Sequence, residues 1–357
     1  MLKKRNAFFS FTTILLLLLL GSFLTGCNIP KAGPTAVPTL ELDADPTSAP
    51  TVEEIAYTPT LPPLKVWLTL GSNGNSGICD LFRAALVTPE LSFVQVEEVE
   101  NLTPSMITAD KKLVVFCGMP ENLEEFTAVS GESVYAVVGN ENRNLPNLWT
   151  IGYDPANELF MAGYFLGLTA NDWRGSGMLP SDSALYGETA SEIFSNGMHY
   201  FCGRCQSVSP PYIVFPQNVM LPESASPAEW ISGMDQVSSS FPNTWYISAS
   251  AETLEVLSVM LEKQHAVITS GEKPEGWQGN WLGSVHVDLK GAFTQLLQRV
   301  DNGESPTVII PELKVITGIQ ASLFNEGKKR NMEAVYSNLI KGLVSPYSPV
   351  PPASFQP

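Results

Sequence analysis

The chain has few basic residues and few histidines. Among its 357 residues, 20 are lysine or arginine and 36 are aspartate or glutamate, which gives a formal net charge of −16. Nucleic-acid phosphates and anionic lipid surfaces both attract lysine and arginine, so this balance argues against a nucleic-acid partner and against docking flat on an anionic membrane. The three histidines lack the spacing of metal ligands, and we expect neither a metal nor another cofactor.

Motifs of catalysis and nucleotide binding are also missing. The sequence contains no GxSxG nucleophile elbow and no GxxxxGK[ST] phosphate-binding loop. Neighbouring acids such as Glu97-Glu98 and Glu124-Glu125 are typical of solvated faces rather than of acid–base pairs. We therefore expect a protein that is not an enzyme. Carboxylates that meet only in the folded chain leave an exported hydrolase as an alternative.

The amino terminus has the features of an export signal. A basic stretch at residues 3–5 precedes an apolar run that ends in Leu24-Thr25-Gly26-Cys27. These four residues resemble the bacterial lipobox, which implies cleavage before Cys27 and a diacylglycerol on its thiol. We expect residues 1–26 to be a lipoprotein signal peptide and Cys27 to anchor the chain in the lipid bilayer, on the extracytoplasmic face of the cell membrane. An uncleaved transmembrane helix is the alternative.

Residues 27–62 are rich in proline, threonine, alanine and acidic residues and have no apolar period. Such a composition buries too little surface to offset the entropy of ordering. We expect Cys27 to begin a disordered tether, which at roughly 3 Å per extended residue reaches up to ~100 Å from the membrane. A tether of this kind suits a receptor that captures a solute and then docks elsewhere.

Cys27 apart, the cysteines are Cys79, Cys117, Cys202 and Cys205. An exported chain permits disulfides. Cys79 and Cys117 are both expected near the carboxyl ends of strands, where they could pair with each other. Cys202 and Cys205 form a CxxC motif that is expected in a loop. A structural or idle pair, which a disulfide could join, is the favoured interpretation of this motif, with a redox site and a metal site as alternatives.

From Leu64 onward, strand-like segments alternate with helical periods, which predicts parallel sheets with right-handed crossovers. We expect a two-lobed α/β clamshell: lobe 1 at 63–153, lobe 2 mostly at 154–306, a hairpin and closing helix that cross between the lobes at 307–350, and a tail at 351–357. The expected strands cover residues 64–70, 92–99, 112–117, 133–138, 148–152, 176–180, 212–215, 245–249, 266–270 and 284–287. The expected helices include 154–173, 188–200, 226–239, 251–263, 289–301 and 329–343.

Five segments resemble, in order and spacing, the basic membrane lipoprotein family of ABC transporter substrate-binding proteins. They read LPNLWTIGY (145–153), MAGYFLGL (161–168), FSNGMHY (194–200), GSV (283–285) and NLIKG (338–342). The resemblance implies a type I periplasmic-binding fold, an ABC permease as membrane partner and a ligand that is often a purine nucleoside. This chain has Cys79, Asn140, Ser250 and His286 where the family commonly has acidic residues or, at the last position, lysine. The ligand class therefore stays open among nucleosides, bases and sugars.

Candidate ligand contacts stand where strands end, because open α/β sheets bind ligands outside their carboxyl ends. Glycines in loop 71–77 let backbone N–H groups approach a ligand, unless this loop is an ordinary turn. Phe82 and the two tryptophans of a Gly-rich segment offer aromatic faces, unless they fill the core. Asp154 could contact a ligand or simply cap a helix. The candidates are Asn73, Asn75, Ser76, Phe82, Asn140, Asp154, Ser250, Trp277, Trp281 and Ser284.

Together these observations predict a lipid-anchored extracytoplasmic solute-binding protein of an ABC-type importer. Two lobes would close over a small polar ligand and present it to a permease in the membrane. A sensor or protein-interaction module built on the same fold is the first alternative, and an exported enzyme is the second.

Overall fold

A computed structural model describes residues 63–71, 74–87, 89–107, 113–129, 133–139, 145–318 and 324–348. The expected signal peptide, Cys27 and the tether lie outside these residues, as do Asn73 and Asn140. The chain divides into two units, Met1–Pro59 and Thr60–Pro357, and the fold below is that of the second unit. No helix in the described ranges is long and apolar enough to cross a membrane.

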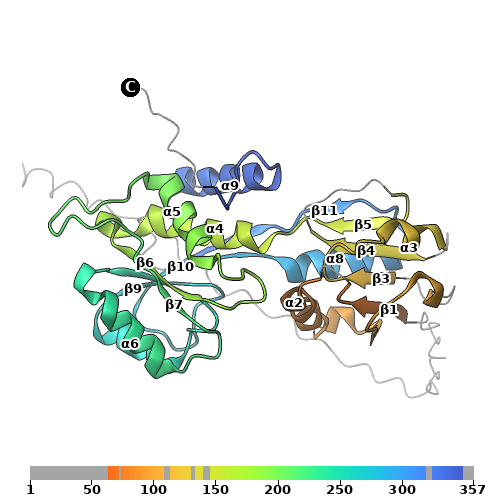
Figure 1. Ribbon diagram of the computed structural model, residues 1–357, viewed down its shortest axis with the longest axis horizontal. Coiled ribbons are helices and arrows are strands. Elements are labelled where there is room, and N and C mark those ends of the chain that lie inside the picture. Colours follow the sequence, from red (N-terminus) through yellow and green to blue (C-terminus); the bar gives the residue numbers. More distant parts are fainter. Residues whose placement is uncertain are drawn as a thin grey trace, which may run out of the picture. The chain divides into compact units, whose positions relative to one another are not determined.

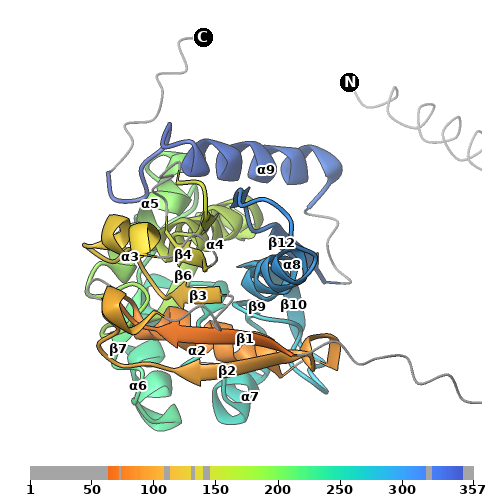
Figure 2. The ribbon, with the colours of Figure 1, turned by 90° about the vertical axis from the view of Figure 1, so that its right-hand side faces the viewer.

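The first sheet is all parallel, with the spatial order β11-β5-β4-β3-β1-β2. Its strands are β1 (Leu64–Thr69), β2 (Val94–Glu98), β3 (Leu113–Phe116), β4 (Val134–Val138), β5 (Leu148–Ile151) and β11 (Val308–Ile309). Every residue of β3 and of β5 is buried, which explains why these strands are continuous apolar runs. Helices α2 (Ser76–Leu86), α3 (Leu123–Val129) and α8 (Leu289–Asp301) accompany this sheet (Figure 2).

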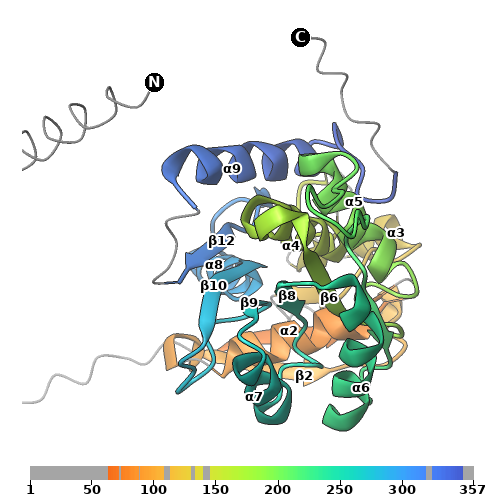
Figure 3. The same cartoon turned by 90° about the vertical axis from the view of Figure 1, so that its left-hand side faces the viewer.

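The second sheet has the order β12-β10-β9-β8-β6-β7, with only β12 antiparallel to its neighbour among the described strands. Its strands are β6 (Gly175–Pro180), β7 (Val219–Leu221), β8 (Thr244–Ile247), β9 (Ala266–Thr269), β10 (Asn280–Val287) and β12 (Leu313–Thr317). Helices α4 (Pro155–Thr169), α5 (Ala190–Cys202) and α9 (Glu326–Ile340) cover one face. Helices α6 (Pro227–Val237) and α7 (Leu254–Glu262) cover the other (Figure 3). The predicted α/β class with two mostly parallel sheets is confirmed.

Helices α4 and α5 pack unusually closely because glycines face each other. A Cβ atom on Gly163 would lie 1.9 Å from the carbonyl oxygen of Phe194, and one on Gly197 would lie 1.9 Å from that of Phe160. Only glycine permits this approach, because it has no side-chain carbon. Asp154 caps α4, since its carboxylate accepts a hydrogen bond from the backbone N–H of Ala156 at 2.9 Å.

The chain passes between the two sheets three times in the described part of the molecule (Figure 1). The first passage, residues 152–154, links β5 to α4. The second lies at Asp288, between β10 and α8, and α8 packs against α2 through an edge-on contact of Phe82 with Phe293. The third, residues 310–312, links β11 to β12. These passages connect the two sheets as a three-stranded hinge would.

Two expectations about strands are wrong. Strands β11 and β12 do not form the expected hairpin, because β11 pairs with β5 and β12 pairs with β10, in different sheets. Residues 212–215 do not form a sheet strand: Val214 makes only an isolated bridge to Gln206. The edge strand of the second sheet is instead β7, which pairs with β6. Pro216, which has no N–H to donate, separates the expected segment from the real strand.

Candidate functional site

The strand orders locate the crevices in which ligands can bind. In each sheet the first strand lies between the second and the third, at β2-β1-β3 and at β7-β6-β8. Successive connections leave in opposite directions from such a point, so the loops diverge and leave a crevice outside the carboxyl ends. The two switch points are therefore β1/β3 in the first sheet and β6/β8 in the second.

A cavity of about 640 Å³ occupies the carboxyl end of the first sheet. The ends of β1, β2 and β3 and the first turns of α2 form its walls, and this volume suits a small-molecule ligand. Among the ligand-contact candidates that fall within the described residues, Ser76 is the one that lines it. The other lining residues include Thr69, Gly71, Arg83, Glu98, Glu100, Asn101, Thr103, Pro120 and Asn122.

The charge of Arg83 in this cavity is already satisfied by neighbours. Its guanidinium donates to both carboxylate oxygens of Glu98, at 2.6 and 2.9 Å, and also to Asp80. The hydrogen bond from Arg83 lowers the pKa of Glu98, ahead of the opposing desolvation. With Glu100 also in the lining, the described part of the cavity wall is acidic overall, and its cation Arg83 is already paired.

A disulfide between Cys79 and Cys117 fixes one wall of the cavity. It joins α2 to the loop after β3, with 5.3 Å between the Cα atoms. Asn75 strengthens the same corner: its backbone N–H donates to Cys117 at 3.1 Å, and its side-chain oxygen accepts from Gly77 at 2.9 Å. The side-chain amide of Asn75 also donates to the carbonyl of Ala184, in the loop after β6. Asn75 thus connects the carboxyl-end loops of both sheets.

Hydroxyl and carboxyl groups gather at the carboxyl end of the second sheet. Ser250 is half-buried, and its Oγ lies 3.1 Å from that of Ser248. Glu252 follows in the same loop, and burial raises the pKa of its carboxyl group. Tyr246 at the end of β8 is buried and feels the charges of Glu158 and Glu252. Of these residues, only Ser250 was singled out from the sequence.

Glu158, half-buried near the start of α4, is a candidate residue that the sequence analysis did not single out. It is the only charged residue between Pro155 and Thr169, and such a lone charge in an apolar helix is the signal that could have found it. Its carboxylate accepts a hydrogen bond from the hydroxyl of Tyr153 at 2.8 Å. Burial raises the pKa of Glu158 to about 7, against hydrogen bonds from Tyr153 and the backbone of Val287 that lower it.

Four other candidates are buried in the structure. Phe82 is 0% exposed and packs on Phe293. Trp277 and Trp281 belong to the apolar cluster on the α6–α7 side of the second sheet, and Trp281 donates to the hydroxyl of Thr269 at 3.0 Å. Trp281 lies within β10, so its expected place in a loop is wrong. Ser284 is 0% exposed within the same strand. The structure does not bring these side chains together with Ser76 or Ser250 in one cavity.

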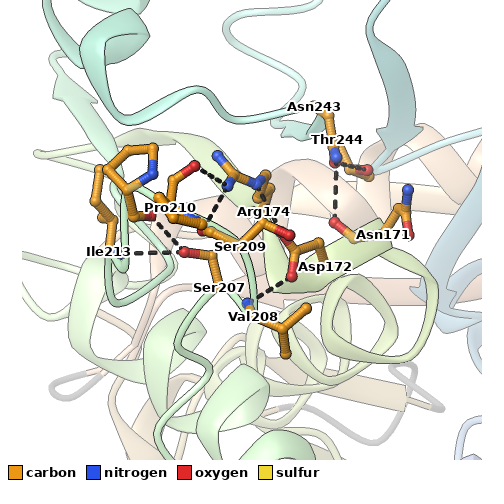
Figure 4. Close-up of polar contacts among 11 residues, drawn as sticks. Asn171, Asp172, Arg174, Ser207, Val208, Ser209, Pro210, Ile213, Asn243 and Thr244 are labelled. Atoms are coloured by element: carbon orange, nitrogen blue, oxygen red, sulfur yellow. Dashed lines mark hydrogen bonds and ion pairs between the residues drawn. The ribbon is translucent and has the colours of Figure 1, made fainter.

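A polar network at the amino end of the second sheet holds the segment that follows the CxxC motif, because it links residues 171–174 to residues 207–213 (Figure 4). Arg174, just before β6, pairs with Asp172 at 2.9 Å and donates to the carbonyl of Ser209 at 3.0 Å. Asp172 accepts from the backbone N–H of Val208 at 2.6 Å. The disulfide between Cys202 and Cys205 closes the start of this segment. It therefore lies at the amino end of β6, opposite to the end where the crevice opens.

In the described ranges, no group of three or more metal-ligating side chains comes together. No protein-family model matches the chain, and no curated protein matches its sequence.

Solved structures show a loose likeness. An ABC transporter solute-binding protein from Conexibacter woesei is 11% identical, with a TM-score of 0.48 over 78% of this chain and 97% of its own. One from Aeropyrum pernix is 13% identical, with 0.46 over 79% and 93%. The Escherichia coli transcriptional repressor ascG is 11% identical, with 0.49 over 71% and 97%. With TM-scores below 0.5, the fold rests on strand order and pairing instead.

Proposed function

We propose that this chain is a solute-binding protein that captures a small polar molecule at the carboxyl ends of its two sheets. The observation that carries this proposal is the 640 Å³ cavity at the β1/β3 switch point of the first sheet. The hydroxyls and carboxyls at the matching end of the second sheet support it. The described cavity wall has polar groups suited to hydrogen-bond a neutral solute and an acidic balance that disfavours anions.

The membrane side of the proposal rests on the sequence. The segment Leu24–Cys27 resembles a lipobox, so we propose a lipid anchor on Cys27 and delivery of the solute to an ABC permease. The resemblance to the basic membrane lipoprotein family and its type I periplasmic-binding fold supports the same function. Expression of the full chain and of Cys27→Ser in a bacterium tests the anchor. Wild type should fractionate with membranes, and a Cys27→Ser chain that stays lipid-labelled would contradict it.

A thermal-shift screen tests solute binding. The full chain is heated with nucleosides, bases, sugars and amino acids, and a true ligand raises the melting temperature with its concentration. Ser76→Trp should abolish the shift, because the indole fills the cavity mouth. Ser258→Trp is the matched control, since Ser258 is an exposed helix residue on α7. If no small solute shifts the melting temperature of the wild type, solute binding is refuted.

A further inference from the structure

The amino end of the second sheet carries exposed apolar side chains, opposite to the end where the crevice opens. In the loop between α5 and β7, Val208 is 72% exposed and Tyr212 is 63% exposed. Pro210 and Pro211 are also exposed. Figure 1 shows this green loop projecting at the left of the view. Phe241, just before β8, is 60% exposed. We call these five residues the amino-end patch.

Arg174, just before β6, joins the two segments that carry the patch. Its guanidinium donates to the carbonyls of Ser209 and Pro210, at 3.0 and 3.4 Å. Its own carbonyl accepts from the backbone N–H of Asn243 at 2.9 Å, and Asn243 follows Phe241 by two residues. Figure 4 shows both segments converging on Arg174. The loop and the segment before β8 therefore meet at the same end of the sheet.

The backbone carbonyls of the projecting loop already have partners within the protein. Two of them accept from Arg174, as described above. The carbonyl of Pro211 accepts from the hydroxyl of Ser207 at 2.6 Å, and that of Tyr212 accepts from the side-chain amide of Gln206 at 3.1 Å. These four consecutive carbonyls do not depend on water for a hydrogen bond. A backbone that enters a lipid bilayer has to meet this condition, because hydrocarbon offers no partners.

Acidic charge is scarce in the segments that carry the patch. The sequence has no aspartate or glutamate at 193–222 or at 236–251, and Arg204 is the one lysine or arginine there. Asp172 lies close to the loop, but its carboxylate pairs with Arg174 at 2.9 Å and accepts from the backbone N–H of Val208 at 2.6 Å. A chain with a formal net charge of −16 thus has two apolar segments without negative charge at this end.

A lipid bilayer is the partner that these features fit. Apolar and aromatic side chains gain free energy when they leave water for the membrane interface. The absence of acid from both segments avoids repulsion by anionic headgroups. A protein interface, in contrast, carries about one hydrogen bond per 100–200 Å². The loop is poorly equipped for such bonds, because the carbonyls of residues 209–212 are already bonded.

The proposed tether would let this end of the protein reach the bilayer. Residues 27–62 would extend up to ~100 Å from an anchor at Cys27, and the described fold begins at residue 63. A domain of about 300 residues has a radius of gyration of only about 19 Å, so any of its faces can turn to the membrane. An anchored chain also meets the bilayer at high effective concentration, so a weak second contact is enough.

We propose that the amino-end patch inserts into the interface of a lipid bilayer and turns the carboxyl end of the second sheet away from the membrane. The proposal goes beyond solute capture, and it rests on the proposed anchor only for the reach of the chain. Apolar insertion, rather than attraction between charges, provides the affinity. It is therefore compatible with the acidic composition of the protein as a whole.

Fluorescence quenching by the bilayer tests the insertion. A fluorophore is attached to the full chain through Val208→Cys or, as the control, through Leu254→Cys. Leu254 is similarly exposed, at 75%, but begins α7 at the carboxyl end of the sheet. Both proteins carry Cys27→Ser, so the uncleaved apolar run that ends at Leu24 holds them in phosphatidylcholine vesicles without lipidation. The cysteines in the two disulfides do not react with the label.

A spin-labelled lipid should quench the fluorophore on residue 208 at least about twofold more strongly than the one on residue 254. Both sites are exposed, so neither label should disturb the fold. Equal quenching of the two fluorophores overturns the proposal.

Two pairs of variants separate insertion from non-specific adhesion, with the fluorophore on residue 208 measuring the ratio of docked to undocked protein. Tyr212→Ser should lower this ratio about fivefold, and Leu254→Ser should leave it unchanged. Gln206→Ala removes the partner of the Tyr212 carbonyl, which water replaces in solution but not in the bilayer, so the ratio should again fall about fivefold. Gln217→Ala frees the carbonyl of Val214, outside the patch, and is the matched control. Equal ratios for Gln206→Ala and Gln217→Ala contradict insertion of the loop.

A protein is the competing partner for this surface. If the fluorophore on residue 208 is unquenched in pure lipid vesicles and is shielded only when other membrane proteins are added, the partner is a protein and the proposal is overturned. The measurements use neither a solute nor a lipid on Cys27. Their failure therefore leaves a positive solute screen and a lipid-labelled Cys27 intact, and a negative solute screen leaves docking on the bilayer intact.

Discussion

The α4–α5 layer and the carboxyl-end loops of the second sheet differ in how much space surrounds the Cα atoms of their glycines. A Cβ atom on Gly163 or on Gly197 would meet a carbonyl oxygen at 1.9 Å, so the two helices have no space to change. A Cβ atom on Gly271, in the loop after β9, would have nothing within 4 Å. The helical layer is a fixed platform, whereas the loops at the carboxyl ends have room for other side chains and for a ligand.

In the first sheet, a carboxyl-end loop is held in place by a disulfide bond. At its carboxyl end, the loop after β3 is cross-linked to α2 by Cys79 and Cys117, which are 38 residues apart in sequence. The cavity there is bounded by a covalent bond rather than by close helix packing. We therefore expect stability to depend on close packing in the α4–α5 layer and on the disulfide at the carboxyl end of the first sheet.

Removal of the Cys79–Cys117 disulfide is the largest change we expect. Replacing both residues with alanine opens a long loop in the unfolded chain and should cost about 4 kcal/mol of unfolding free energy. The pair Cys202 and Cys205, only 3 residues apart, is the matched control and should cost about half as much. Urea unfolding of both double variants measures this. Equal losses would show that the cross-link is not what holds the cavity wall.

The next effect is expected in the helical layer. Gly163→Ala must push α5 away from α4, and this overpacking should lower the free energy of unfolding by about 3 kcal/mol. Gly271→Ala has open space and an ordinary backbone conformation, so it should stay within about 0.5 kcal/mol of wild type. Thermal and urea unfolding compare the two. If both variants lose similar stability, the contrast between platform and loops does not hold.

A smaller effect is expected from Glu158 as the pH rises. The folded carboxyl group keeps its proton up to about pH 7, whereas the unfolded one ionises near its usual pKa of 4.5. The stability that this raised pKa provides is complete below the unfolded value and is lost as the pH rises through 7. Relative to Glu158→Gln, wild type should lose roughly 2 kcal/mol between about pH 5 and about pH 8. Parallel unfolding curves for the two proteins across this range would exclude it.

The sequence predicted the platform better than the site. Strong apolar periods and continuous buried runs revealed both sheets and most helices, and the cap at Asp154 was visible in the Asp-Pro pair. The hairpin prediction failed because β11 pairs with β5 in the first sheet and β12 pairs with β10 in the second. Both partner strands precede β11 and β12 in the sequence. Trp281 was misplaced because a Gly-rich stretch hid the start of β10. Sequence periodicity does not specify long-range pairing.

The same limit applies to the site residues, because sequence periodicity does not show which distant segments meet in the fold. Ser76 begins the helix that follows the loop after β1, and Ser250 lies in the loop after β8, so their positions could be inferred from strand ends. The pKa of Glu158 is raised by burial, and only the folded chain creates that burial. Phe82 has the composition of a stacking residue, but its helix turns it toward Phe293.

The smallest expected change in stability tests the carboxyl end of the second sheet directly. Ser250→Ala removes a half-buried hydroxyl that contacts Ser248, so the free energy of unfolding should change by less than about 0.5 kcal/mol. If Ser250 contacts the solute, loss of one neutral hydrogen bond should weaken binding by about 3- to 10-fold. Titration calorimetry with a solute from the thermal screen measures this, with Ser258→Ala on α7 as the control. Because space surrounds the carboxyl-end loop, a substitution there can change the affinity for a solute without changing the stability of the fold. Gly163→Ala should instead lower the stability of the fold. If Ser250→Ala loses stability but keeps full affinity, this loop contributes to stability, as the α4–α5 layer does, and not to solute binding.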